Sequence, residues 1–138
     1  MKANELLMIG DWVYSAFAEY PCKVEGIELT ESGYAFVKVG GVDEYKSIES
    51  LSPIPLTPEI LEKNGFAIKA KWAQIGNFGD SPLIMWHFVD DPILRDYKTE
   101  LEVHQNNTGK VHVRIPCEYV HELQHALRLC NIEKTIVL

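Results

Sequence analysis

The segment His121-Glu122-Leu123-Gln124-His125 matches the pattern His-Glu-x-x-His, which is typical of zinc hydrolases. On a helix, two imidazoles at this spacing lie one turn apart and can bind the same zinc ion. The glutamate between them can then take a proton from a metal-bound water. One candidate chemistry is therefore a zinc-dependent hydrolase, with His121 and His125 as metal ligands and Glu122 as general base.

The remainder of the sequence favours a solvated helix face at these positions. A catalytic zinc ion needs a third protein ligand, which such proteases usually take from further along the chain. Only 13 residues follow His125, and Glu133 is the only acidic residue or histidine among them. At 100° per residue both histidines point away from the apolar side of the helix. That side is formed by Tyr119, Val120, Leu123, Ala126, Leu127 and Cys130. We therefore predict no catalytic, metal-binding or cofactor-binding residue here and keep the zinc hydrolase as the alternative.

Histidines on predicted strands offer other sets of ligands. His104 and His112 pair across a predicted hairpin, where Glu102 could join them as a third metal ligand. Two imidazoles on a water-facing sheet surface explain the same pattern, and we favour that interpretation. His87 shares a side with apolar residues, so we expect a hydrogen-bonded core or boundary histidine there rather than a metal ligand. Asp90-Asp91-Pro92 resembles a carboxylate pair but is typical of a turn.

Composition predicts a globular protein without a membrane-spanning segment, for which binding to nucleic acid is disfavoured by charge although a local basic patch stays open. The chain has 138 residues, 46% of them hydrophobic, and a net charge of −7. Residues 1–54 hold 4 basic and 9 acidic side chains, which makes them a poor match for a phosphate backbone. Cys22, Cys117 and Cys130 have no Cys-x-x-Cys spacing, so we interpret them as reduced thiols. No apolar leader or membrane-length segment is present, and we expect a cytoplasmic location.

Residues 1–52 are predicted to form a small β-barrel of the Src-homology-3 kind. Short β-type runs that begin near Trp12, Cys22, Tyr34 and Tyr45 are separated by turn residues. Such a barrel is a scaffold for binding and specifies no chemistry by itself. Its aromatic residues could form a binding surface, although a barrel this small should bury some of them. They are Trp12, Tyr14, Phe17 and Tyr20.

Residues 53–138 are predicted to form an α+β domain in which two helices cover an antiparallel sheet. Pro53-Ile54-Pro55 is a stiff connector between the two domains, because proline fixes φ and biases the preceding residue toward extended geometry. Thr57 and Pro58 then predict the start of a helix over 57–64, which Asn64-Gly65 ends. A second helix is expected over 117–130, with its apolar side on the sheet.

The strands of this domain are expected at 66–72, 83–89, 99–105 and 110–115, with a short final strand at 135–138. Alternation of polar residues fixes the register of the hairpin between the third and fourth strands. In that register Glu102 faces Arg114, Val103 faces Val113 and His104 faces His112. The register requires a three-residue loop, Asn107-Thr108-Gly109.

Three stretches of the chain resemble a family of small uncharacterised Bacteroidetes proteins that often occur among phage or mobile-element genes. They are Met1 to Leu6 with Ile9 to Val13, Pro53 to Thr57 with Ile60-Leu61 and Asn64-Gly65-Phe66, and Tyr119 to Gln124. The family has no assigned activity, so the resemblance implies no catalytic residue. Its members often read His-Gln-Leu-Gln-Asn at the positions of His121 to His125, without the general base and second ligand.

The function that the sequence favours is therefore a non-enzymatic intracellular module that binds a protein partner. The resemblance adds a role accessory to a phage or mobile element. The zinc-dependent hydrolase built on His121, Glu122 and His125 is the alternative.

Overall fold

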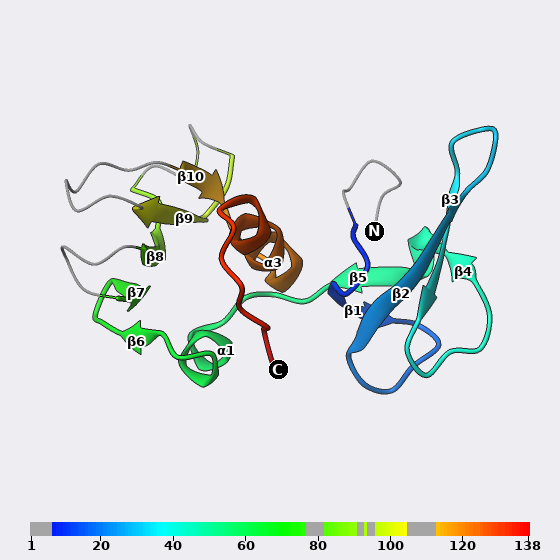
Figure 1. Cartoon of the computed structure of the whole chain (residues 1–138), viewed down its shortest axis with the longest axis horizontal. Coiled ribbons are helices and arrows are strands. Elements are labelled where there is room, and N and C mark those ends of the chain that lie inside the picture. Colours follow the sequence, from blue (N-terminus) through cyan, green and yellow to red (C-terminus); the bar gives the residue numbers. More distant parts are fainter. Residues whose placement is uncertain (1–6, 77–81, 91–92, 94–95, 105–112) are drawn as a thin grey trace. The chain divides into compact units, whose positions relative to one another are not determined.

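The computed structural model describes residues 7–76, 82–90, 93, 96–104 and 113–138. The chain divides into two compact units, Met1–Ile54 and Pro55–Leu138 (Figure 1). Their boundary lies two residues beyond the position 52 that the sequence suggests. Each unit contains an antiparallel sheet, and helices occur in the second, so the α+β class is confirmed.

Five strands are described in the first unit, paired in the order β4-β3-β2-β1-β5. They are β1 (Trp12–Ser15), β2 (Cys22–Leu29), β3 (Ala35–Val39), β4 (Lys46–Ser47) and β5 (Leu51–Pro53), with a 3-10 turn η1 (Ile48–Ser50) before β5. The register of β2 shifts between Val24 and Gly26. Such a bulge bends a strand, and β2 pairs with β1 at its start and with β3 further along. The described strand pairs do not close into a barrel, because β4 and β5 remain the two edges.

Small aliphatic side chains fill the core of this unit. In β1 the alternation of a strand buries Val13 and Ser15 and turns Tyr14 outward. The buried cluster consists of Leu7, Val13, Cys22, Val24, Ala35, Val37, Val39, Val42, Ile48 and Leu51. The prediction that the unit must bury some of its early aromatic residues holds only for Trp12, which is partly buried but lies outside this cluster. Residues from four of its strands and from η1 supply enough apolar volume without them.

The sheet of the second unit has the strand order β10-β9-β8-β7-β6 among the described residues. Its elements are α1 (Pro58–Lys63), β6 (Ala67–Ile68), β7 (Trp72–Ile75), β8 (Leu83–Phe88), β9 (Thr99–His104), β10 (Val113–Pro116) and α3 (Val120–Leu129). The single strand predicted over 66–72 is wrong, since a tight turn there separates β6 from β7. The backbone N–H of Lys69 donates to the carbonyl of Trp72 across 2.7 Å. In the sequence, the alternation of polar and apolar residues continues across this turn, so the two strands looked like one.

The other strand predictions fare better. β8 is central, between β7 and β9, as its continuous apolar run predicts. The register of β9 and β10 is confirmed, with Glu102 opposite Arg114 and Val103 opposite Val113. The predicted pairing of His104 with His112 and the loop 107–109 lie outside the described residues.

The final strand predicted at 135–138 is absent from this described segment. Instead, the side-chain amide of Asn64 bonds the backbone of Val137 as a strand partner would. Asn64 Nδ2 donates to the Val137 carbonyl at 2.7 Å, and the Val137 N–H donates to Asn64 Oδ1 at 2.8 Å. This pair of bonds joins the end of α1 to the last residues of the chain.

Both helices begin near the predicted residues. Thr57 caps α1, and its hydroxyl accepts a hydrogen bond from the Ile60 N–H. α3 begins at Val120, three residues later than predicted, and lies beside the sheet (Figure 1). The segment before it is held by the Cys117 carbonyl, which accepts bonds from Trp86 Nε1 and the Thr99 hydroxyl. Among the described residues, no helix is long and apolar enough to cross a membrane.

Leu123 provides a test of how α3 packs. Its side chain is fully buried, whereas Leu129 on the same helix is 80% exposed. We expect Leu123→Ala to lower the free energy of unfolding by about 2–5 kcal/mol, because it removes buried methyl groups and leaves a cavity. Leu129→Ala is the matched control and should change it by less than about 0.5 kcal/mol. Urea unfolding followed by circular dichroism measures both, and equal losses would contradict this orientation.

Candidate functional site

The two histidines of the His-Glu-x-x-His segment lie in different environments on α3. His121 is only 6% exposed and His125 is partly exposed. Their ring centroids are 5.6 Å apart, and the ring of Tyr119 stacks on that of His121 at 5.9 Å. The prediction that both imidazoles face water is wrong for His121. The buried side of α3 is wider than the apolar stripe, since it includes Gln124 as well.

Glu122 caps the start of α3. Its Oε1 accepts hydrogen bonds from the backbone N–H groups of Glu118 and Tyr119, both at 3.1 Å. A carboxylate is favourable there because the first N–H groups of a helix have no partner within the helix. Burial raises the pKa of Glu122 and outweighs these two bonds, which act to lower it. Among the described residues, no third His, Cys, Asp or Glu completes a metal-ligand group with His121 and His125.

A second group of ionisable residues lies on the face of the sheet that carries the even-numbered residues of β9. All six residues of β9 are buried, including Glu100, Glu102 and His104. The prediction of a water-facing polar surface at His104 is therefore wrong. β9 lies between β8 and β10, and its polar side chains contact His87 from one neighbour and Arg114 from the other.

These five residues form what we call the β9 cluster: His87, Glu100, Glu102, His104 and Arg114. His87 Nε2 lies 3.1 Å from Glu102 Oε1 and 3.4 Å from Glu100 Oε1. Arg114 Nη2 lies 2.6 Å from the same Glu102 oxygen. His104 Nε2 lies 3.3 Å from Glu102 Oε2, so Glu102 interacts with three cationic or titratable side chains. The hydroxyl of Tyr97 also donates to Glu100 Oε2 at 3.0 Å.

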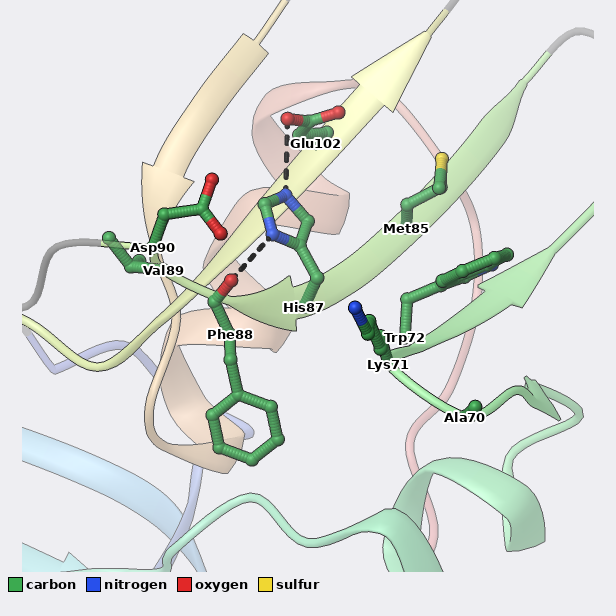
Figure 2. A pocket seen from close by; sticks show the side chains of 9 residues that line it. All are labelled: Ala70, Lys71, Trp72, Met85, His87, Phe88, Val89, Asp90 and Glu102. Carbon is green, nitrogen blue, oxygen red and sulfur yellow. Dashed lines mark hydrogen bonds and ion pairs between the residues drawn. The ribbon is translucent and has the colours of Figure 1, made fainter.

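The cluster borders a pocket of about 390 Å³, shown in Figure 2. Its lining consists of Ala70, Lys71, Trp72, Met85, His87, Phe88, Val89, Asp90 and Glu102. His87 Nδ1 lies 3.1 Å from the Phe88 carbonyl, which confirms the predicted hydrogen-bonded boundary histidine. Asp90 lines the same pocket, and Asp91 lies outside the described residues. Buried carboxylates beside an open pocket favour a cationic ligand.

Sequence reasoning missed the contact between His87 and the carboxylates. The hairpin register placed Glu102 opposite Arg114, but it said nothing of β8. The missing signal was the pairing of β8 with β9, which sets His87 opposite Glu100 and Met85 opposite Glu102. Strand alternation then places His87 and both carboxylates on the same face.

The first unit carries a different candidate, a group of four aromatic residues close together in the chain that we call the β1 aromatic surface: Trp12, Tyr14, Phe17 and Tyr20. Tyr14 is 45% exposed, Phe17 57% and Tyr20 72%, while Trp12 is partly buried. Two lysines lie over its rings. Lys23 Nζ is 5.0 Å from the ring centroid of Trp12, and Lys46 Nζ is 4.6 Å from that of Phe17.

The charge on Glu102 should make stability depend on pH. Burial acts to raise the pKa of Glu102, but bonds from His104 and His87 and the charge of Arg114 outweigh it and hold the pKa below its ordinary value of 4.5. The ionised form thus stabilises the folded state above pH 4.5, and this contribution is lost as pH falls through the lowered pKa.

We therefore expect the wild type to lose more unfolding free energy than Glu102→Gln between pH 5 and pH 3. Urea titrations of both proteins across this range measure the difference. Glu28→Gln, an exposed glutamate on β2, is the matched control and should follow the wild type. Parallel curves for Glu102→Gln and the wild type would contradict the assignment.

Comparison with protein-family models, curated proteins and solved structures finds no match to this chain. No residue role can therefore be carried over from a characterised relative. The resemblance to the Bacteroidetes family remains a prediction, and both candidate sites depend on the geometry given above.

Proposed function

We propose that this protein is a non-enzymatic interaction module whose β1 aromatic surface binds a basic segment of a partner polypeptide. The observation that carries the proposal is the exposure of Tyr14, Phe17 and Tyr20, three aromatic side chains close together in the chain. Exposed aromatic residues of this size supply most of the binding energy in many protein interfaces.

The core of the first unit is complete without the four aromatic residues. The core of the first unit is built from aliphatic side chains and Cys22, and it contains none of the four. Each exposed ring costs free energy in water that burial against a partner would recover. Their placement on the surface therefore supports a role in binding.

Charge indicates the chemistry of the partner. Residues 1–54 carry 9 acidic and 4 basic side chains. Complementary charge speeds association and selects partners, so a basic segment is favoured over an acidic one. The rings of Trp12 and Phe17 already hold lysine ammonium groups over their faces. Arginine or lysine side chains of a partner can occupy the same kind of position.

The finer fold assignment that we propose for this unit is a small barrel of the Src-homology-3 kind. The bulge in β2 supports it. A bulge bends the strand, so that its two halves can pair with different neighbours and the sheet can curve toward a barrel. The single turn η1 between β4 and β5 supports it as well, since it carries the chain from one edge strand to the other.

We further propose an intracellular location, in which the module is accessory to a phage or mobile element. Cys22, Cys117 and Cys130 are free thiols, and reduced thiols are typical of the cytoplasm. The accessory role depends on the sequence resemblance alone.

Selection from a random peptide library with the full chain tests the function directly. We expect the recovered peptides to be enriched in arginine and lysine and to bind more weakly at higher salt. Measured by fluorescence anisotropy, Phe17→Ser should weaken binding of a selected peptide at least tenfold, which corresponds to about 1.4 kcal/mol. Tyr14→Ser should act in the same direction.

The matched control is Leu29→Ser, which removes another exposed apolar side chain of this unit, 74% exposed at the end of β2. Its affinity for the peptide should equal that of the wild type. The proposal fails if no basic peptide is enriched. It also fails if Phe17→Ser and Leu29→Ser weaken binding equally.

A further inference from the structure

We propose that His87, Glu100 and Glu102 bind one divalent transition-metal ion, with Zn²⁺ as the expected ion, where the β9 cluster meets the pocket. One nitrogen and two carboxylate oxygens of these residues lie within 4.8 Å of one another. The site is on the sheet of the second unit and uses neither the His-Glu-x-x-His segment nor the β1 aromatic surface. Its existence is therefore independent of the proposed function.

Both separations from the His87 nitrogen to the carboxylate oxygens are those of ligands on a common ion. Two ligands that each lie about 2.0–2.2 Å from a zinc ion are about 2.8–3.6 Å apart, depending on whether the ion has six or four ligands. His87 Nε2 lies 3.1 Å from Glu102 Oε1 and 3.4 Å from Glu100 Oε1. Small adjustments of these three side chains would suffice for coordination.

The second nitrogen of His87 supplies an independent argument. Nδ1 lies 3.1 Å from the Phe88 carbonyl oxygen, and Figure 2 marks this contact with a dashed line. A carbonyl only accepts hydrogen bonds, so the proton of the imidazole belongs on Nδ1. Nε2 faces the two carboxylates, where it either donates a second proton to Glu102 or binds a cation held between them. Metal-binding histidines commonly donate their other N–H to a backbone carbonyl in this way.

Charge and burial also suit an ion of charge +2. The side chains of Glu100 and Glu102 are 3% and 11% exposed, so their negative charges have little water to stabilise them. Arg114 lies near both oxygens that the ion would use, with Nη2 2.6 Å from Glu102 Oε1 and Nε 3.6 Å from Glu100 Oε1. Its side chain is 45% exposed and can turn toward solvent when the ion binds. His104, on the other oxygen of Glu102, would hold the carboxylate in orientation.

The ligand set favours zinc over other common ions. Magnesium and calcium take oxygen ligands, whereas imidazole together with carboxylates suits Zn²⁺ and its neighbours in the first transition row. The set contains no thiolate, which argues against Cu⁺. The pocket beside His87 would admit water to the remaining coordination positions.

Zinc titration of the full chain, prepared without a histidine tag and dialysed against chelator, tests the site. Competition with a chromophoric chelator should show one Zn²⁺ per chain. We expect His87→Ala and Glu100→Gln each to weaken zinc binding at least tenfold. Binding of Co²⁺ should produce visible absorption bands in the wild type that both variants lack.

His125→Ala is the matched control, because it removes a partly exposed histidine of the same unit and should leave zinc affinity unchanged. His87→Gln, a polar replacement, serves if His87→Ala does not give a native circular dichroism spectrum. The proposal is overturned if the wild type binds no zinc. It is also overturned if His87 and Glu100 variants bind as the wild type does, or if His125→Ala alone abolishes binding.

Discussion

The burial of two carboxylates on one strand is the constraint around which the second unit is organised. Glu100 and Glu102 project from the same face of β9, where neither can be fully hydrated. A buried charge is tolerated only when hydrogen bonds or opposite charges replace the lost water. Residues on three strands and one loop meet this need: His87 on β8, His104 on β9 itself, Arg114 on β10 and Tyr97 before β9. The register of the sheet is therefore fixed by electrostatics on this face and by apolar packing on the other.

The segment His121 to His125 shows how a sequence motif acquires a different physical explanation in its structural setting. Its glutamate binds the N–H groups at the start of α3, and its first histidine is buried against the ring of Tyr119. Helix capping requires a carboxylate near the first turn, and helical packing accepts an imidazole with an aromatic neighbour. These two local requirements give His121 and Glu122 each a place in the packing and capping of α3. His87 on β8 belongs to no sequence motif, yet its ring nitrogen lies close to carboxylate oxygens of both Glu100 and Glu102.

Much of the fold could be predicted where the deciding interactions are local. Thr57 and Pro58 predict the start of α1, because they suit the N-cap and the first turn of a helix. The alternation around Glu102 and Val103 sets the hairpin register. Prediction failed where neighbours from elsewhere decide. The burial of His104 depends on the flanking strands. The turn after Ile68 cannot be recognised from an alternating pattern that continues across it. The candidate site could not be predicted for the same reason, because the pairing of His87 with Glu100 depends on which strands are neighbours in the sheet.

The order of pairing in the two sheets also bears on how quickly each unit can fold. In the second unit the described strands pair only with their neighbours in the chain, so each pair can form by closing a connection between consecutive strands. The first unit must also pair β1 with β5. This pairing brings Val13 opposite Pro53, two residues separated in the sequence by most of the unit. Closing such a loop costs more chain entropy than forming a hairpin, and non-local pairings slow folding. The β1–β5 pairing is therefore the step that should limit the rate at which the first unit reaches its native state.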